Sequence, residues 1–554
     1  MEDTKVINIE EKYADPCINI ALDTIARNKQ AIFFVNTKSS AEKLSEEISK
    51  KIKNITLNEL SEKIGNILAH PTQQCKRLQK IVHHGAAFHH AGLTPKQREL
   101  VEENFKSGNI KIICSTPTLA VGVDMPAFRA VVRDLKRYGG RWGMQDIPVL
   151  EYQQMAGRAG RPSFDAWGEA ITVAKSETDK EDIFFKYINA ENEDIYSKLA
   201  VEPVLRTYLL SLISSRYVKT RKEIVKFFSK TFWAYQYKDM EKLEMIIDRM
   251  LELLEEWEFV ISIDKNLENK EIENEKIEKE NLDADCLVDG FISAEKLLEN
   301  NTFDSKNIKY RATELGQRVA ELYLDPYTAN QLIVAMNKSL NININLFSIL
   351  HMISNTLEIR PLLNIRVRDD AMINEALAVY EDNFLIEEPS SFDFEHDEFM
   401  KTIKTALFMN DWCNEMDEQF LLDKYAIRPG EIRVKLDRAD WLIYSCVELS
   451  KILSLNDLNR FLLKARFRLK NGVREELLPL LKLKGIGRVR GRKMFDNGLR
   501  TLGDLKKIDI SSLVTIIGKA TARSVKEQLD EKVPENMKVS DKKRIGQMSL
   551  GKYS

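Results

Sequence analysis

Four strand-like runs in the first part of this 554-residue chain constrain its fold more than any other feature. They are "QAIFFVN" (30–36), "IKIICST" (110–116), "AVVRDLKRY" (130–138) and "GEAITVA" (168–174). Apolar runs of this kind are typical of buried parallel strands, and helical patterns such as "SAEKLSEEISKKI" (40–52) separate them. The alternation predicts an α/β domain with a doubly wound parallel sheet, in which ligands bind at the carboxyl ends of the strands.

Beyond this domain the sequence reads as helical, with one short hairpin. Residues 202–264 run from short helices into a strand, and 310–326 completes a pattern typical of a winged helix. A polar, Asn/Glu/Lys-rich stretch at about 264–283 predicts a solvated insertion in the hairpin. We therefore expect a sheet domain over 1–195, a winged helix over 196–326, a helical bundle over 327–465, a domain of short helices with glycine turns over 466–535 and a flexible tail over 536–554.

Composition excludes several classes of protein. No apolar run reaches the roughly 18 residues that a membrane helix needs, and the amino terminus lacks the apolar core of a signal peptide. The six cysteines show no CxxC pairing, so we expect reduced thiols in an intracellular, cytoplasmic protein without a zinc site. The net charge is only −2, but residues 461–526 carry 17 Lys or Arg against 5 Asp or Glu, an excess that suits phosphate groups.

The stretch "YQQMAGRAGRP" (152–162) holds residues suited to binding phosphate. Arg158 and Arg161 are three residues apart, on one side of a helical turn, and their guanidinium groups can bind phosphate oxygens bidentately. Glycines between them allow a partner to approach the backbone closely. A surface salt bridge is the alternative role for both arginines.

Two further motifs point to phosphate. In "AFHHAGL" (87–93) a strand ends in a turn that we expect to meet a phosphodiester, and no carboxylate or thiol at ligand spacing supports a metal site at its histidines. In "STPTLAVGVDMP" (115–126) the hydroxyls of Thr116 and Thr118 follow a strand, where they bind phosphate or cap a helix. We expect these motifs and the arginine stretch at the carboxyl ends of the strands or on the helices that follow.

In this order, "AFHHAGL", "STPTLAVGVDMP" and "QMAGRAGR" resemble motifs IVa, V and VI of superfamily-2 helicases, and "QAIFFVNTKSSAEKLS" resembles motif IV. The chain is similar to the archaeal Hjm-type DNA repair helicases, which are kin to the helicase part of polymerase theta. "EYQQMAGRAGRP", "YRATELGQRVAELYLDP" and "NGVREELLPLLKLKGIGRVRGRKMF" extend this resemblance through most of the chain. It implies that 1–195 is a second RecA-like motor domain.

The resemblance also implies roles for the site residues. Gln154, Arg158 and Arg161 would reach ATP across a cleft, with both arginines acting as arginine fingers on the γ-phosphate. Gly122 and Asp124 would line the same cleft, although the family often has Asn at the second position. ATP and Mg²⁺ would be held mainly by another domain, and no residue of this chain is expected to bind a metal.

The motifs of that other domain are not found in this sequence. The Gly-Lys pairs in "IIGKAT" (516–521) and "LGKYS" (550–554) lack the neighbours of a GxxxxGK[ST] loop. The acidic pairs in "HDEFM" (396–400) and "MDEQF" (416–420) follow polar or helical sequence and lack the histidine of a DExH motif. We therefore expect a missing first RecA-like domain, supplied by a separate chain if the gene is split, or lost if this chain is a fragment.

Between motifs V and VI, residues 130–152 read as a strand, a glycine-rich turn and a strand. Tyr138, Arg141 and Trp142 would lie at the tip of this hairpin and could wedge between base pairs. The resemblance implies that the hairpin separates the duplex strands. A plain connecting hairpin is the alternative.

A long helix over 429–453 carries Arg433, Arg438 and Trp441 near one face. A base can stack on the indole while an arginine holds its phosphate. The resemblance implies that this is a ratchet helix that tracks the translocating strand. Trp441 could equally belong to the core, because apolar residues follow it.

The stretch "LPLLKLKGIGRVRGRKMFDNGLRTLGDL" (478–505) has a helix-hairpin-helix signature. Gly485 and Gly487 would expose backbone N–H groups to a phosphate, with Arg488 and Arg490 beside them. This contact carries no sequence information, so the domain is expected to bind DNA generally. A solvated basic face without function is the alternative.

The tail ends in "KKRIGQMSLGKYS". Gln547, Leu550 and Tyr553 match a sliding-clamp-binding pattern, although only one aromatic stands where two are usual. A disordered tail without a partner is the alternative.

Together these features predict the C-terminal part of an ATP-dependent 3′→5′ DNA helicase that acts on forked or single-stranded DNA in replication-coupled repair, associated with the nucleoid. The alternatives are a catalytically inactive DNA-binding subunit and an RNA helicase of the same superfamily. The predicted DNA contacts are His89, Ala91, Gly92, Thr116, Thr118, Arg141, Trp142, Arg433, Arg438, Trp441, Gly485, Gly487, Arg488 and Arg490.

Overall fold

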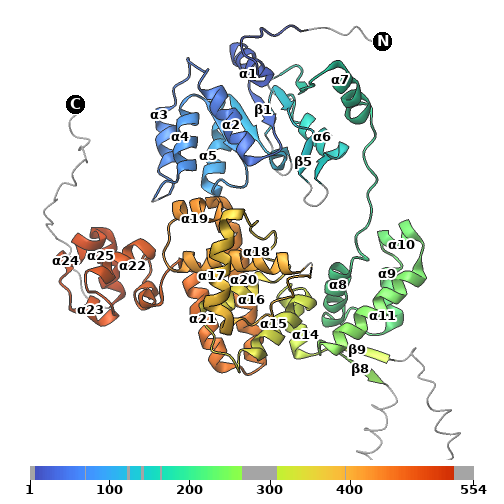
Figure 1. The fold of residues 1–554 in the computed structure, drawn as a ribbon, viewed down its shortest axis with the longest axis vertical. Helices are drawn as coiled ribbons and strands as arrows, with labels where there is room; N and C mark the ends of the chain where they lie inside the picture. Colours follow the sequence, from blue (N-terminus) through green and yellow to red (C-terminus); the bar gives the residue numbers. More distant parts are fainter. Residues whose placement is uncertain are drawn as a thin grey trace, which may run out of the picture.

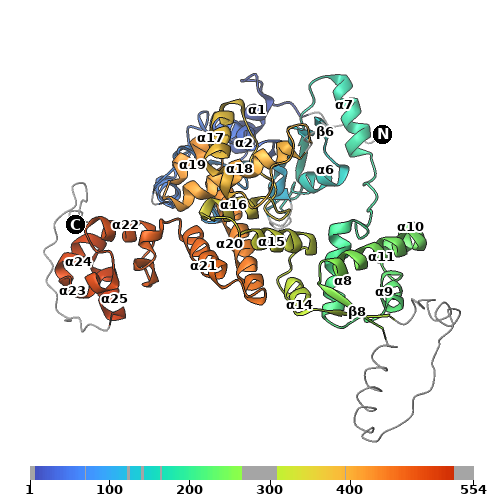
Figure 2. The ribbon, with the colours of Figure 1, turned by 60° about the horizontal axis from the view of Figure 1, so that its bottom comes forward.

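The computed structural model describes residues 7–68, 70–120, 125–138, 143–161, 165–264, 308–393 and 395–529. Figure 1 shows a sheet domain above a helical domain, with two smaller groups of elements on either side of the latter. Figure 2 shows these two groups at opposite ends of the molecule. No helix in the described ranges is long and apolar enough to cross a membrane.

The sheet domain is built on five parallel strands in the order β2-β3-β1-β4-β7. Their bounds are β1 Ala31–Phe34, β2 Ala86–His89, β3 Ile112–Ser115, β4 Arg129–Val132 and β7 Glu169–Thr172. Every residue of the first four is buried, which explains their apolar sequences. The predicted parallel sheet is therefore confirmed.

Helices cover both faces of this sheet. They are α1 Pro16–Ala26, α2 Lys38–Ser49, α3 Asn58–Gly65, α4 Gln73–His83, α5 Pro95–Lys106, the short η1 Pro117–Ala120, α6 Val149–Ala156, α7 Glu177–Ile183 and η3 Phe184–Ile188. Threonines begin three of them: the side chains of Thr37, Thr72 and Thr94 each accept a hydrogen bond from a backbone N–H in the first turn. These caps fix where the three helices begin.

The expected strand over 130–138 is wrong as a single element. The chain leaves the sheet after β4 and forms a separate antiparallel hairpin of β5 Lys136–Tyr138 and β6 Met144–Asp146. Asp134 marks the exit, since its carboxylate accepts the N–H of Asn36 at 3.1 Å. All residues of β5 and β6 are exposed, so the hairpin projects from the domain.

The next elements form a unit that we call the α8–α14 unit. It contains α8 Glu202–Ser214, α9 Arg221–Phe228, α10 Phe232–Tyr237, α11 Met240–Glu256, β8 Val260–Asp264, β9 Ile308–Ala312 and α14 Glu314–Glu321. β8 and β9 pair antiparallel. The predicted insertion at 264–283 lies, beyond its first residue, outside the described residues.

The helical domain follows. Its helices are α15 Pro326–Lys338, α16 Leu346–Ser354, α17 Asp370–Tyr380, α18 His396–Cys413, α19 Glu418–Tyr425, α20 Pro429–Ile452 and α21 Asn456–Asn471, with short turns η4 Val367–Asp369 and η5 Glu381–Asn383. One continuous hydrophobic core joins this domain to the α8–α14 unit. The long helix predicted over 429–453 is observed as α20.

The last described elements form a separate small domain with its own core. They are η6 Glu475–Leu477, η7 Leu480–Lys482, α22 Arg488–Asp496, α23 Leu502–Lys507, α24 Ile510–Ile517 and α25 Lys519–Gln528. We call it the α22–α25 domain. Positive φ angles at Gly485 (84°) and Gly518 (87°) turn the chain just before α22 and between α24 and α25, as the predicted glycine turns require.

Candidate nucleotide and nucleic-acid interface

The loops of motifs V and VI lie side by side at the end of α6. A parallel bridge joins Ala127 to Ala159, and the N–H of Gly160 donates to the carbonyl of Ala127 at 2.6 Å. Gly160 has φ +91°, and its backbone lies so close to Gly168 that a Cβ at 168 would overlap it. The glycine therefore serves backbone packing, and it places the two arginines on either side of this bridge.

Arg158 and Arg161 both have partners within the sheet domain. The Nε of Arg158 donates to the carbonyl of Ala120 at 3.1 Å, beside motif V. The Nε of Arg161 pairs with Asp165 at 2.6 Å, and the same carboxylate takes Lys29. Hydrogen bonds from Arg161 make the largest contribution to lowering the pKa of Asp165, and those from Lys29 lower it further. Burial acts in the opposite direction and raises this pKa. The charge of Arg161 is thus compensated in this structure.

Residues 152–156 of the arginine stretch lie on a helix, α6, as expected, but Arg161 lies elsewhere. Another Arg161 nitrogen donates to the side-chain oxygen of Gln30 at 2.6 Å, and Gln30 immediately precedes β1. The stretch therefore reaches the amino ends of the strands, because α6 leads back to the start of β7. Gln154 lies exposed on α6 and stays a predicted nucleotide contact.

The predicted DNA contacts at His89 and Gly92 are not supported by their surroundings. His89 is 4% exposed, and its Nε2 lies 2.8 Å from Glu102. Burial lowers its pKa, which favours the neutral ring. The N–H of Gly92 donates to His90, and its carbonyl accepts from Gln74 and from Gly430 of α20. The backbone groups of Gly92 are already used in hydrogen bonds, and the Nδ1 of His89, which has no partner among the described residues, is buried, so neither residue presents an accessible group to a phosphate.

The remaining predicted contacts of the sheet domain differ in accessibility. Ala91 and Thr118 are exposed, whereas Thr116 is buried and its hydroxyl lies 2.9 Å from that of Thr118. Some predicted site residues lie outside the described residues, so their roles stay predictions: Gly122, Asp124, Arg141, Trp142, Gln547, Leu550 and Tyr553.

Along α20, the structure changes the roles of two predicted contacts. The indole N–H of Trp441 donates to the carbonyl of Leu322 at 3.2 Å, and the ring packs against the core. Trp441 is therefore a packing residue, the alternative that the sequence left open. Arg438 is exposed but donates to the carbonyl of Glu358, while Arg433 lies open to solvent beside Asp437.

A cavity of about 370 Å³ lies between the sheet domain and the helical domain. Lys38 and Ala91 line it from one side, and Arg366, Lys435 and Arg438 line it from the other. Sequence reasoning missed Lys38, Arg366 and Lys435, because residues hundreds of positions apart meet there. Lys435 could have been noticed, since it is three residues before Arg438 on the same helix.

Lys435 is a lysine held in a largely buried place. It is 7% exposed, and its Nζ donates to the carbonyl of Ile359 at 3.0 Å and to that of Pro361. Burial, with the nearby Arg438, lowers the pKa of Lys435 to about 8. Its charge is therefore present at neutral pH and is lost within a range that experiments can reach.

In the α22–α25 domain, the glycine turn is open as predicted. Apart from the adjacent residues in the chain, no atom of the described residues lies within 4 Å of the position that a Cβ would take at Gly485 or Gly487. Arg490 is exposed and donates to the carbonyl of Gly485 at 2.9 Å. Arg488 instead packs over the ring of Trp412 at 5.2 Å, and burial lowers its pKa. Arg488 thus docks this domain on the helical domain rather than pointing to solvent.

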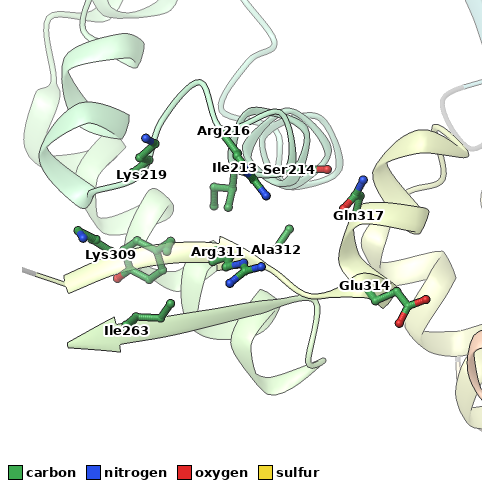
Figure 3. A pocket seen from close by; sticks show the side chains of 11 residues that line it. Ile213, Ser214, Arg216, Lys219, Ile263, Lys309, Arg311, Ala312, Glu314 and Gln317 are labelled. Atoms are coloured by element: carbon green, nitrogen blue, oxygen red, sulfur yellow. The ribbon is translucent and has the colours of Figure 1, made fainter. Parts of the chain in front are cut away.

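A second basic cavity, of about 510 Å³, lies in the α8–α14 unit. Arg216 and Lys219 come from the loop between α8 and α9, and Arg311 comes from β9; Figure 3 shows them around the same hollow. No ion pair joins these three cations to a carboxylate within the described part of the chain. The sequence did not reveal this site, because roughly ninety positions separate its two halves.

Family models match four segments of the chain. These are a helicase conserved C-terminal domain over 14–163, a helix-turn-helix domain over 168–261, an archaeal helicase domain 4 over 347–472 and a SAM-like helix-hairpin-helix tandem over 477–531. Their order agrees with the described elements. It supports the predicted architecture of an α/β motor domain followed by DNA-binding and helical domains.

Similar proteins match most of the chain. ATP-dependent DNA helicase Hel308 of Methanococcus vannielii is 35% identical over 503 residues, covering 88% of this chain and 64% of the relative. The proteins of the same name from Pyrococcus horikoshii and Pyrococcus abyssi are 36% and 33% identical, covering 90% and 95% of this chain and 63% and 67% of the relatives. The chain thus spans about two thirds of the length of these relatives.

Proposed function

This chain belongs to the Hel308 family of DNA helicases, and from this membership we propose that it is the C-terminal part of an ATP-dependent 3′→5′ helicase that acts on forked DNA in repair. It would supply one half of the nucleotide site and most of the residues along which the DNA strand passes. A first RecA-like domain, on the same or another polypeptide, would supply the phosphate loop and the Mg²⁺ ligands.

The observation that carries this proposal is the basic cavity between the sheet domain and α20. In a translocating enzyme the motor domain and the other domains contact the same DNA strand. Residues of both the sheet domain and the helical domain line this cavity. Arg366, Lys435 and Arg438 provide positive charge for a phosphate backbone without reading sequence, whereas Lys38 is paired with Glu431, which also lines the cavity. Arg490 and the glycine turn of the α22–α25 domain would extend the contact.

Exposed apolar side chains support docking of the first RecA-like domain. Tyr235 of α10 is 77% exposed, and Ile195 and Tyr196 of the linker are 75% and 60% exposed. Gln236 bonds to the linker at Ile195 and Ser197, so these side chains belong to one local structure. An apolar surface of this kind suits a neighbouring domain.

For the nucleotide, we propose that Gln154, Arg158 and Arg161 act on ATP held by the first domain. The chemistry is hydrolysis of the γ-phosphate, with Mg²⁺ neutralising charge and the arginines stabilising the transition state. In this role Arg161 must exchange Asp165 for phosphate oxygens. Gly122 and Asp124 would line the same cleft.

Two alternative functions remain. A catalytically inactive DNA-binding subunit is favoured by one observation, the compensation of Arg161 by Asp165. An RNA helicase is disfavoured by the helix-hairpin-helix tandem, which suits DNA. Binding competition between matched RNA and DNA forks distinguishes the latter.

The test combines this chain with a first RecA-like domain. Alone, the chain should bind forked and single-stranded DNA and hydrolyse no ATP, because its sequence holds no phosphate loop. The combination should show DNA-dependent hydrolysis, and Arg158→Ala or Arg161→Ala should lower turnover by about 10³-fold or more with DNA affinity nearly unchanged.

The matched control is Arg460→Ala, which removes an arginine that is 76% exposed on α21. This variant should keep full turnover. Hydrolysis by the purified chain alone, or full turnover of the Arg161→Ala combination, would contradict the shared-site proposal. No hydrolysis in any combination would favour the DNA-binding subunit.

A further inference from the structure

The first turn of α20 is attached to the sheet domain by unusually close backbone packing. The N–H of Gly430 donates to the carbonyl of Gly92 at 3.0 Å. A Cβ at position 430 would overlap the carbonyl oxygens of Leu93 and Ala91, and one at 92 would overlap the stem of Arg428. At position 430 the overlapped atoms are backbone, so only glycine allows this approach there; at position 92 the overlapped atoms belong to the side chain of Arg428.

A buried carboxylate reinforces the same contact. Glu42 of α2 is 10% exposed, and its oxygens lie 3.1 Å from Arg428, 3.2 Å from His90 and 2.9 Å from Arg77. Burial raises the pKa of Glu42, but His90 and Arg428 outweigh it and hold that pKa below its usual range. The carboxylate is therefore ionised, and it holds the start of α20 by charge as well as by shape.

Two outer contacts complete the attachment. Lys38 of α2 forms an ion pair with Glu431 of α20, and the N–H of Gln73 at the start of α4 donates to the side chain of Gln419 in α19 at 2.7 Å. Figure 1 shows α19 and the adjoining start of α20 directly against the helices of the sheet domain. Contacts from α2 and the loop after β2 thus converge on the start of α20, and α4 contacts the preceding helix α19.

The attached helix also lines the basic cavity. Lys435 and Arg438 lie in its second and third turns, next to the turn that holds Gly430. A displacement of the sheet domain would therefore be passed along α20 to the residues that face the strand. In tightly packed interfaces such shifts are transmitted rather than absorbed.

We propose that Glu42, Gly92, Arg428 and Gly430 form a rigid joint that makes the sheet domain and α20 move as one body, so that motion driven by ATP moves the strand. Glu42 and Gly430 are positioning residues in this proposal, because neither touches nucleotide. The second part rests on the proposed function, whereas the rigidity of the joint does not.

The rigidity is tested on the chain as it is, without nucleotide. Single-molecule fluorescence transfer is measured between dyes at Lys43→Cys on α2 and Arg460→Cys on α21, two exposed positions, in a Cys286→Ser background. The five cysteines in the described residues are buried and should not be labelled. The unaltered joint should give one narrow distance distribution, and Gly430→Ala should broaden it or split it.

Gly503→Ala in α23 is the matched control, because a Cβ there meets only an ordinary contact at 3.5 Å. Arg428→Met is a milder variant, which keeps a similar stem and leaves Glu42 paired with His90 and Arg77. It should broaden the distribution less than Gly430→Ala does. A narrow distribution that persists in both joint variants, or a broad one in the unaltered chain, would overturn the rigid joint.

The coupling is tested with the first RecA-like domain added. Gly430→Ala should lower duplex unwinding by about 10²-fold, the scale for a small misplacement of working groups, while DNA-stimulated ATP hydrolysis stays within about twofold of the unaltered enzyme. Equal losses of both activities in a folded variant would contradict the coupling. If the unaltered combination hydrolyses no ATP, the proposed function fails, and the fluorescence result still decides whether the joint is rigid.

Discussion

Lys435 and Glu42 are charged side chains in places where burial favours the neutral form. Each keeps its charge through specific partners: carbonyl oxygens for the lysine, and cations for the carboxylate. They lie on the two sides of the contact between the sheet domain and the helical domain. Removing the charge of Lys435 or Glu42 should therefore have effects beyond the loss of one contact between the two domains.

The pH dependence of DNA binding follows from Lys435. Burial lowers the pKa of Lys435 from 10.5 to about 8. The folded protein therefore loses the Lys435 proton at a lower pH than the unfolded chain does. We expect affinity for single-stranded DNA to fall as the pH passes through about 8, measured by fluorescence anisotropy at fixed salt. The slope of log affinity against log salt should also flatten by about 0.7, the value for one phosphate contact on a single strand.

The control for this prediction is Lys435→Met. It should bind more weakly at neutral pH and show no such step, because it has no proton to lose there. The pH dependence of stability has the opposite sign to that of DNA affinity. Between pH 8 and 10.5 the unfolded chain keeps the Lys435 proton and the folded protein does not, so the free energy of unfolding should rise across that window. Equal pH profiles for the two proteins would exclude Lys435 from the DNA contact.

At the scale of single elements, α20 performs three tasks along its length. Its first turn packs on the sheet domain, its next turns face the basic cavity, and Trp441 packs into the core. The sequence predicted the helix and its bounds well, because its pattern is long and its first residues favour a helix start. It could not predict which turn meets which neighbour, since those neighbours lie far away in the chain.

The second prediction concerns the β5–β6 hairpin, a single element. Tyr138 is 75% exposed and pairs with Met144 at the described end of the hairpin. Shortening residues 138–143 should reduce duplex unwinding by the combined enzyme and largely preserve DNA-stimulated ATP hydrolysis, because we expect the hairpin to contact duplex rather than nucleotide. Both rates are measured on the same forked substrate.

A milder version replaces only Tyr138 with alanine. Its control is Tyr323→Ala, which removes a tyrosine that is 84% exposed away from the hairpin. Parallel loss of unwinding and hydrolysis in the shortened protein would indicate a structural hairpin.

The glycine turn before α22 gives a third prediction for an element. Gly487 has φ −109°, a value open to any residue, and empty space around it, so Gly487→Val should fold. Gly485 has φ +84°, so Gly485→Val should also strain the turn. Both should weaken DNA binding about equally for all sequences and flatten the salt slope, because the contact is to phosphate. Gly503→Val is the control. Unchanged DNA affinity in a folded Gly487→Val variant would exclude this turn from the DNA contact.

For the whole molecule, sequence reasoning succeeded where the signal is local or ordered along the chain. The parallel sheet followed from buried apolar runs, and the residues assigned to motifs IV to VI lie within the segment that matches a helicase conserved C-terminal domain. The predicted DNA contacts at His89, Gly92 and Trp441 are not supported by their surroundings, because His89 pairs with Glu102 within the sheet domain, and Gly92 and Trp441 form hydrogen bonds to neighbouring units. Such pairing depends on tertiary contacts, which a single sequence does not encode in any short pattern.

The continuous core that joins the α8–α14 unit to the helical domain has a practical consequence for dividing this protein into pieces. Cutting near residue 326 would split that core and leave two apolar faces in water, so neither fragment is a good candidate for separate production. The linker over 191–196 is exposed throughout, so dividing the chain there would expose less apolar surface. A crystallographer or an engineer who wishes to exchange the sheet domain between relatives should cut there, and should transplant the first turn of α20 together with it.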